Sequence, residues 1–339
     1  MKSTIKFIGT LETISPVSVC LPDNNGYMPR TSNGKYFIPA TSIRGMLRST
    51  AATAIAQVLL MKVDKRLGVD EHYMNFVGVD TGRKVKLGGG YERIGNNIAI
   101  RESNPQVSLF GHFSIAGKLK MGNAYCSEND EPLKIYGNGS RNHILNRSPE
   151  ISAFINSDEI DYVKQIMDAD ALTAIDSSDL KGEKKKLEAE SKKLTGDEKK
   201  AVISQINEID DQIKKIKESR VGSTESILRP LKGFQAIDLG YALEHRMMLT
   251  NATEDELQYL LWVLWKASYD FKIGGHQNLG CGEVHASWKI TKTSLENPNP
   301  IELGTLTIDD DGFKIEGIEF NPSLIENKII NGEFDFTVY

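Results

Sequence analysis

The sequence predicts an α+β protein whose core follows the order βαββαβ and carries large insertions. Three observations lead to this prediction. Segments of alternating polarity, which are typical of half-buried strands, stand near both ends of the first 290 residues. Two segments with apolar residues at helical spacing lie between these strands. A lysine- and glutamate-rich stretch in the middle has a much narrower apolar seam, which is typical of an inserted helical hairpin.

The first strand is expected at 4–15 and ends at Pro16. Residues 36–39 then lead into the first helix, and Thr41 or Ser42 is expected to cap its free backbone N–H groups. Apolar residues recur in this helix at steps of three and four, so one face is expected to be buried: Ile43, Met46, Leu47, Ala51, Ala54, Ile55, Val58 and Leu59.

The remaining core elements follow at long intervals. Strands are expected at 115–125, 241–249 and 283–290. A capping-box sequence at 253–256 opens the second helix, whose expected buried stripe comprises Leu257, Leu260, Leu261, Leu264 and Ser268. These elements give a ferredoxin-like, RRM-like arrangement. The segment 97–101 would add one middle strand too many, so it is the strand prediction that we would give up.

This pattern divides the chain into a core at 1–126 and 236–291, an insertion at 127–235, and a C-terminal extension at 292–339. Within the insertion, a thumb-like segment is expected to precede an antiparallel helical hairpin at about 179–220. The extension is expected to form short strands and turns that pack on the core.

Charge is unevenly distributed along the chain. The extension has three lysines and ten acidic residues, a local charge of −7, although the whole chain carries only −5. The preceding 291 residues are therefore about +2, and 24–66 contains seven basic residues against Asp64 alone. Such a basic region is what a bound polyanion requires, although solvated surface charge is the ordinary interpretation.

Three cysteines, Cys20, Cys126 and Cys281, show neither a CxxC pair nor the spacing of a zinc site. The chain opens without a basic and then apolar leader, and no apolar run approaches the length that spans a membrane. We therefore expect a soluble cytoplasmic protein.

The start of the first helix carries the first functional motif, Ile38-Pro39-Ala40-Thr41-Ser42-Ile43-Arg44-Gly45-Met46-Leu47-Arg48. Arg44 and Arg48 are four residues apart and fall on one side of the first two turns. Two guanidinium groups, two hydroxyls and a helix N-terminus together favour phosphate binding. By itself, the segment also fits an ordinary capped amphipathic helix with solvated arginines.

A second motif lies far along the chain: Ile273-Gly274-Gly275-His276-Gln277-Asn278-Leu279-Gly280-Cys281-Gly282-Glu283-Val284. Four glycines in nine residues, between a helix and a strand, allow backbone amides to approach a bulky polar ligand. The spacing matches neither a Walker phosphate loop nor a dinucleotide fingerprint. Alone this loop is weak evidence, but together with the first motif it is much more specific.

The two motifs resemble the RAMP superfamily, the repeat-associated RNA-binding proteins of CRISPR systems. In that family a segment of the form IPxSSlrGxlR opens the first helix, and a glycine-rich loop precedes the last core strand. Leu109-Phe110-Gly111, followed by 117–124, resembles a third family segment. The chain is most similar to the backbone subunit (the "Cas seven" group) of a class 1 CRISPR effector complex, nearest to type IV and next to type III.

The resemblance implies that copies of the chain lie side by side along a guide RNA, present it for pairing with target DNA or RNA, and contact other effector subunits. No cofactor, metal ion or membrane is expected. Together with Arg30 and Lys35 of the basic region, the residues expected to bind RNA are Thr41, Ser42, Arg44, Arg48, Gly274, Gly275, His276, Gln277 and Asn278. The expected thumb residues are Asn142, His143, Asn146 and Arg147.

Two other classes of function remain open. The chain could be an RNA-cleaving enzyme of the same superfamily, in which histidine often acts as general base. No two of its six histidines stand at a spacing that indicates a catalytic pair: His72, His112, His143, His245, His276 and His285. It could also be a structural filament protein that binds no RNA, which the basic helix and the glycine-rich loop argue against.

A metal-dependent endoribonuclease is the main alternative. In type III relatives, an aspartate in the loop before the first helix serves metal-dependent cleavage of the bound target. The corresponding position here is Asn24, with Asp23 next to it. An amide binds a divalent cation poorly and takes no proton, so we expect no cleavage unless the loop shifts by one residue.

Overall fold

The computed structural model describes residues 3–19, 27–79, 97–127, 130–137, 139–140, 157–191, 196–218, 230–231 and 233–339. The chain divides into two compact units, Met1–Tyr136 with Phe234–Tyr339, and Gly137–Gly233. The expected catalytic alternatives Asp23 and Asn24 lie outside the described residues, as do Asn142, His143, Asn146 and Arg147.

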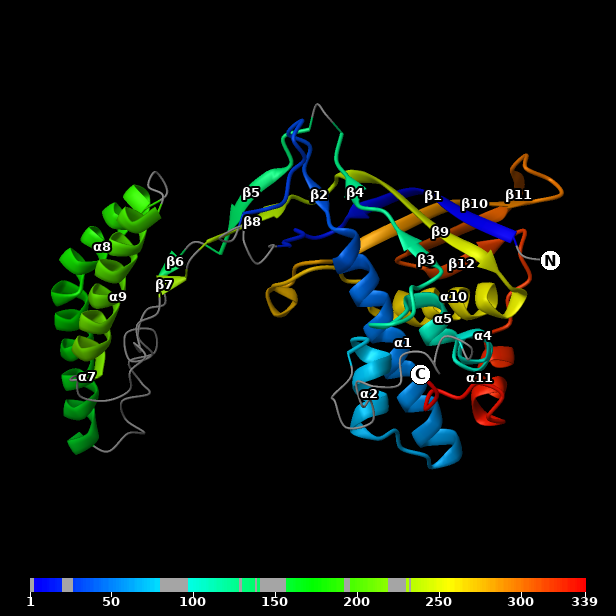
Figure 1. The fold of residues 1–339 in the computed structure, drawn as a ribbon, viewed down its shortest axis with the longest axis horizontal. Coiled ribbons are helices and arrows are strands. Elements are labelled where there is room, and N and C mark those ends of the chain that lie inside the picture. Colours follow the sequence, from blue (N-terminus) through cyan, green and yellow to red (C-terminus); the bar gives the residue numbers. More distant parts are fainter. Residues whose placement is uncertain are drawn as a thin grey trace. The chain divides into compact units, whose positions relative to one another are not determined.

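The first unit is built on an antiparallel sheet (Figure 1). Its order is β12-β11-β10-β1-β9-β4-β2, and β3 also pairs with β9. The strands are β1 (Ser3–Thr13), β2 (Phe37–Ile38), β3 (Leu119–Met121), β4 (Ala124–Tyr125), β9 (Ala242–Ala252), β10 (Val284–Ser294), β11 (Ile301–Asp309) and β12 (Gly312–Glu316). In the central part, β1 lies between β10 and β9, with β3 and β4 beyond, which is the strand order of a ferredoxin-like core. The predicted fold class is confirmed.

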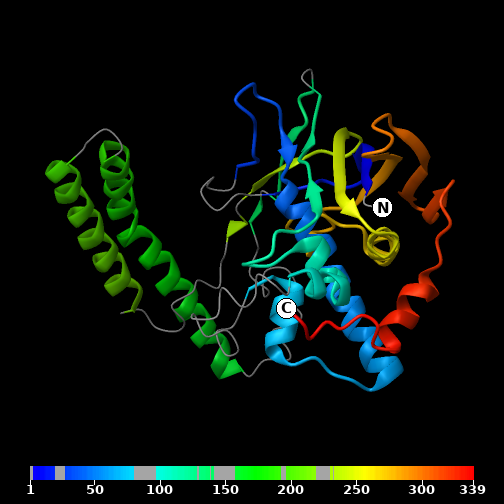
Figure 2. The ribbon, with the colours of Figure 1, turned by 45° about the vertical axis from the view of Figure 1, so that its right-hand side comes forward.

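Helices cover one face of this sheet (Figure 2). They are α1 (Ala40–Val63), α2 (Val69–Phe76), α4 (Asn97–Ser103), α5 (Pro105–Phe110), α10 (Glu254–Ala267) and α11 (Pro322–Ile330). Alternate residues of β1 face these helices, and Phe7 and Leu11 are fully buried. The apolar stripes of α1 and α10 pack on the same face because their spacing follows the helical repeat. No helix in the described part of the chain is long and apolar enough to cross a membrane.

Two local predictions were wrong, and the possible strand at 97–101, which we would give up, is the helix α4. The C-terminal extension contains α11 as well as strands, and Asn321 caps it through a bond from the Ser323 N–H (3.0 Å). Neither Thr41 nor Ser42 caps α1, which begins at Ala40, and the Ala40 N–H instead donates to Asn123 Oδ1 (2.8 Å). That acceptor lies 83 residues further along the chain, so the local sequence gave no sign of it.

The second unit contains α7 (Ser157–Asp176), α8 (Ser178–Ser191), α9 (Gly196–Glu218) and the short ladder of β6 (Gly139–Ser140) with β7 (Pro230–Leu231). The predicted helical hairpin corresponds to α8 and α9, and an ion pair joins Lys184 to Asp210 (2.6 Å). The preceding α7 was not predicted. A narrow seam leaves most side chains of α8 and α9 exposed.

The second unit is expected to be removable. The chain leaves the first unit after β5 (Leu133–Tyr136) and re-enters it at β8 (Phe234–Ile237). These two strands pair antiparallel, with Tyr136 opposite Phe234. Replacing Gly137–Gly233 with Asn-Gly should therefore close a two-residue hairpin. We expect a monodisperse first unit with a single cooperative thermal transition. Aggregated or unfolded material in gel filtration would contradict this prediction.

A buried histidine gives the first unit a pH-dependent stability. His245 on β9 is 2% exposed, and its Nδ1 accepts a hydrogen bond from Trp288 Nε1 on β10 (3.1 Å). Gly9 of β1 lies between them in register, and its lack of a side chain leaves room for this contact across the middle strand. Burial lowers the pKa of His245 to about 4.

Protonation of His245 therefore favours the unfolded chain, whose histidine pKa is about 6.5. The stabilising contribution is fully present above pH 6.5 and is lost as pH falls toward 4, about 3 kcal/mol in all. Urea unfolding at pH 7 and pH 4.5 should show this loss, and His245→Phe should reduce the difference. The same pH dependence in both proteins would contradict the assignment.

Candidate nucleic-acid interface

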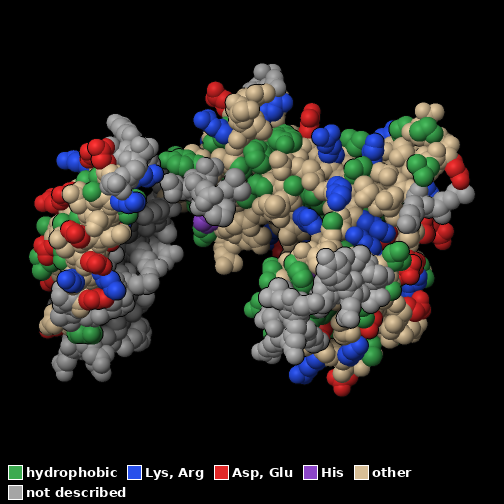
Figure 3. Space-filling model, viewed as in Figure 1, with side chains coloured by type: hydrophobic (Ala, Val, Ile, Leu, Met, Phe, Trp, Pro, Cys, Tyr) green, Lys and Arg blue, Asp and Glu red, His purple; other side chains and the backbone are tan. Residues whose placement is uncertain are grey.

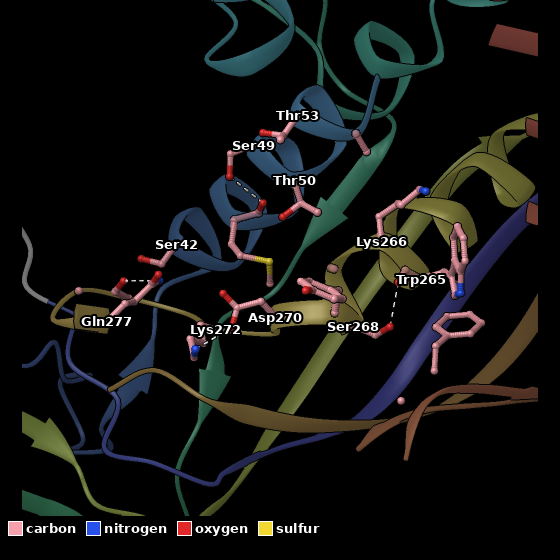
Figure 4. Close-up of a pocket in the computed structure, with 18 of the residues that line it drawn as sticks. Ser42, Ser49, Thr50, Thr53, Trp265, Lys266, Ser268, Asp270, Lys272 and Gln277 are labelled. Atoms are coloured by element: carbon pink, nitrogen blue, oxygen red, sulfur yellow. Dashed lines mark hydrogen bonds and ion pairs between the residues drawn. The ribbon is translucent and has the colours of Figure 1, made fainter. Parts of the chain in front are cut away.

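A cleft of about 1,520 Å³ in the first unit lies between α1, the end of α10 and the glycine-rich loop (Figure 4). Hydroxyl and amide side chains of α1 form one wall: Ser42, Ser49, Thr50, Thr53 and Gln57. They lie together because their spacing places them on the helical face beside the apolar stripe. The opposite wall contains Lys266, Ser268, Tyr269, Asp270 and Lys272, and the glycine-rich loop supplies Gly274, Gly275, His276 and Gln277. Both sequence motifs therefore contribute to one cleft.

The lysines of the cleft already have anionic partners. Lys272 pairs with Asp270 (2.7 Å) and Lys266 pairs with Glu326 (2.8 Å). The Lys266 ammonium also lies over the Trp265 ring, 4.4 Å from its centroid. Because these charges are balanced, hydroxyls and backbone amides supply much of the polar surface that a phosphate chain would contact.

The glycine-rich loop is held against the segment that follows β1. The Gly275 N–H donates to the Ser18 carbonyl (2.8 Å), and the Gly282 N–H donates to the Pro16 carbonyl (2.9 Å). Gly274 has φ +94°, and a side chain there would lie only 2.4 Å from the Ser18 carbonyl oxygen. This glycine is therefore required by close backbone packing. Further along the loop, Gln277–Leu279 form a short 3-10 turn, and Gln277 Nε2 donates back to the Gly274 carbonyl (3.0 Å).

A second, smaller hollow of about 670 Å³ lies on the other side of the start of α1. Its described lining includes Thr41, Arg44, Gly45, His112 and Lys120. The Arg44 guanidinium donates to the Phe110 carbonyl, and partial burial lowers the pKa of Arg44 without removing its charge at neutral pH. A side chain at Gly117 would lie 2.4 Å from the Leu109 carbonyl oxygen and 3.0 Å from Arg44 Nη2, so close packing of both requires glycine there.

Basic side chains continue from this hollow onto the sheet face that the helices leave open. Lys120 of β3 and Lys6 of β1 both lie opposite Met248 of β9, and Arg246 lies two residues along β9. Figure 3 shows Lys and Arg side chains gathered over β1, β3 and β9. The local charge around the hollow is therefore positive although the whole chain is acidic.

Arg48 also borders this hollow, but it exposes little of its side chain there, contrary to the sequence prediction of an exposed phosphate contact. Its side chain is turned into the protein and is only 9% exposed. The guanidinium donates to the carbonyls of Met74 (2.7 Å) and Asn75 (3.0 Å) at the end of α2, and burial lowers its pKa to about 10. These contacts join α1 to the end of α2, where the partial negative charge of the helix C-terminus favours a buried cation.

The other predicted residues are divided among several places. Ser42 lines the cleft, Thr41 lines the smaller hollow, and Asn278 lies in the 3-10 turn without lining either. Arg30 and Lys35 belong to a hairpin-like turn, where the Thr31 N–H donates to the Lys35 carbonyl (2.8 Å). Among the described residues that line the two hollows, none comes from this turn.

The comparison with protein families places these motifs in a known group. A model of the RAMP superfamily matches residues 10–285, a range that includes α1, both hollows and the glycine-rich loop. The chain belongs to the RAMP superfamily. RAMP proteins are CRISPR-associated and bind RNA, so the two hollows around α1 are candidate RNA-binding surfaces. No curated protein matches the sequence.

In this RAMP chain, several residues of the candidate interface were missed at the level of sequence. Ser49, Thr50 and Thr53 continue the helical face that begins at Ser42. Their spacing in the sequence predicts a polar face beside the apolar stripe, so these residues could have been found. Tyr269 and Lys272 lie in the connection from α10 to the glycine-rich loop, where no periodic pattern marks them.

Proposed function

We propose that this RAMP protein is a backbone subunit of a CRISPR ribonucleoprotein. It binds a guide RNA across the first turns of α1, from the cleft on one side to the hollow on the other. Further copies bind next to it along the same RNA, and the guide is presented for pairing with target DNA or RNA. Its nearest relatives are expected among type IV complexes and then type III complexes.

The observation that carries this proposal is an exposed glycine, Gly45, near the start of α1. It lies within the first two turns of the 24-residue helix α1 and is exposed. Glycine in a helix interior costs about 1 kcal/mol relative to alanine. Nothing in the described part of the chain explains that cost, because a side chain at Gly45 would meet no atom within 4 Å.

The position of Gly45 on the helix indicates what the glycine is for. The buried residues Ile43 and Leu47 face the core, whereas Gly45 lies on the opposite, open side with Ser42 and Ser49 near it on the helical surface. The cleft and the hollow flank this open side. A missing side chain allows an RNA backbone to lie directly on the helix between them.

The test is a pair of substitutions at this position. Gly45→Ala should raise the melting temperature by about 2 °C, since alanine stabilises a helix by about 1 kcal/mol relative to glycine. Gly45→Gln should keep that stability but weaken binding of a fluorescent single-stranded RNA at least about tenfold, because its side chain occupies the path. Met61→Gln, at an exposed position near the other end of α1, is the matched control and should change neither quantity. Undiminished RNA affinity in Gly45→Gln would refute the path over α1.

The proposed role as a backbone subunit predicts that several copies of the protein bind one RNA, and the number of copies can be measured. Native mass spectrometry on RNAs of increasing length should show more copies of the protein on longer RNAs. If only one copy bound each RNA, whatever its length, the protein would bind RNA as a single subunit and the backbone-subunit role would be refuted.

A further inference from the structure

We propose that the cleft is a base-stacking site, in which the open face of the His276 ring takes one unpaired nucleobase of single-stranded RNA. This inference rests on the proposed RNA-binding function and adds to it the part of the RNA that the glycine-rich loop recognises.

The ring of His276 is fixed by a neighbouring aromatic side chain. It stacks on Phe234 with 3.8 Å between ring centroids and an angle of 9° between planes. Phe234 is itself stacked on Tyr136 at 6.3 Å, and the Tyr136 hydroxyl donates to Asp238. Phe234 covers one face of the imidazole, so the exposure of His276 comes from its edge and its other face. A flat ring supported in this way is the arrangement on which bases stack in single-strand-binding proteins.

The backbone at His276 is also unusual. Its φ is +59°, in the left-handed region that non-glycine residues occupy at a cost. Gly274, Gly280 and Gly282 of the same loop have positive φ as well, and there the chain uses glycine. Histidine costs more than glycine at such a position, so a use for its ring beyond closing the turn would offset that cost.

The walls of the cleft complete the site. Tyr269 lines the same cleft and is 96% exposed, so its ring has almost no packing role in the free protein and is a second surface for a base. The hydroxyls of α1, shown in Figure 4, face the same space and can contact sugar and phosphate groups. A base inside a duplex is already stacked on its neighbours, and therefore this arrangement selects unpaired RNA.

The experiment uses two fluorescein-labelled RNAs of 12 nucleotides, one of adenosines and one in which every base is removed. His276→Asn keeps a residue that tolerates left-handed φ but removes the ring. We expect this variant to bind the adenosine RNA about 5- to 150-fold more weakly than the unmodified protein, the range for one base–aromatic stack. Both proteins should bind the abasic RNA equally, and His276→Phe should restore binding of the adenosine RNA.

Tyr269→Ser is a second variant that leaves the fold intact, because this side chain is almost fully exposed. It should weaken binding of the adenosine RNA and not that of the abasic RNA. The stacking proposal is overturned if His276→Asn and Tyr269→Ser bind the adenosine RNA as tightly as the unmodified protein. It is also overturned if both variants lose the two RNAs equally. An unmodified protein that binds neither RNA would refute the proposed function itself, whereas one that binds both equally would refute stacking alone.

Discussion

Glu256→Ala is expected to lower the free energy of unfolding by about 3–5 kcal/mol, the range for breaking a buried ion pair. The carboxylate is almost completely buried, and its Oε1 accepts hydrogen bonds from Lys118 Nζ and Ser108 Oγ, both at 2.5 Å. Its Oε2 accepts from the Thr253 N–H (2.9 Å), which completes the capping box of α10. One side chain thus joins α5, the start of β3 and α10. Its removal leaves a partly buried ammonium, a buried hydroxyl and a helix end without their acceptor.

Urea denaturation at pH 7 measures this effect, and two variants calibrate it. Glu256→Gln keeps the shape and an acceptor oxygen, so its loss should be smaller. Glu254→Ala removes an exposed carboxylate from the same first turn and should cost less than about 1 kcal/mol. Equal losses for Glu256→Ala and Glu254→Ala would show that the network around Glu256 contributes little.

Arg48→Ala is expected to lower the free energy of unfolding by about 3 kcal/mol. The folded variant should still bind RNA with normal affinity. The guanidinium joins α1 to the end of α2, and Gln106 Nε2 also donates to the Asn75 carbonyl (2.9 Å). Gln106 in turn accepts from the Tyr259 hydroxyl (2.9 Å). Alanine leaves the buried Met74 carbonyl without its Arg48 donor. Arg48→Lys keeps the charge but not the planar pair of donors, so it should recover only part of the stability.

Comparison with Arg44→Ala separates structure from binding. We expect Arg44→Ala to weaken RNA binding and to flatten its salt dependence by about 0.7 for one lost phosphate contact. Arg48→Ala should shift the melting temperature instead, while its folded fraction keeps the normal salt slope. If the folded Arg48→Ala protein showed a reduced salt dependence of RNA binding, Arg48 would contact RNA directly and the prediction would be wrong.

The elements predicted best were those whose signal is periodic and local. Both core helices and the strands at 4–15, 241–249 and 283–290 lie close to where the alternation of apolar residues placed them. The capping box of α10 was also predicted correctly, because its partners Thr253 and Glu256 are three residues apart. By contrast, α4 and α11 are short helices whose few turns carry little periodic signal.

By itself, the sequence determined that one glycine-rich loop and one helix start belong to a RAMP core, since these motifs depend on residue types at fixed spacing. It also determined the apolar faces that bring the strands and helices together. Only the tertiary structure decided which of two arginines, one helical turn apart, stays at the surface. Arg44 and Arg48 are equivalent in a helical projection, but α2 packs against α1 and its terminal carbonyls lie beside Arg48. The Phe234–His276 stack was equally unpredictable, because it joins the start of β8 to the glycine-rich loop, and no local pattern relates these two places.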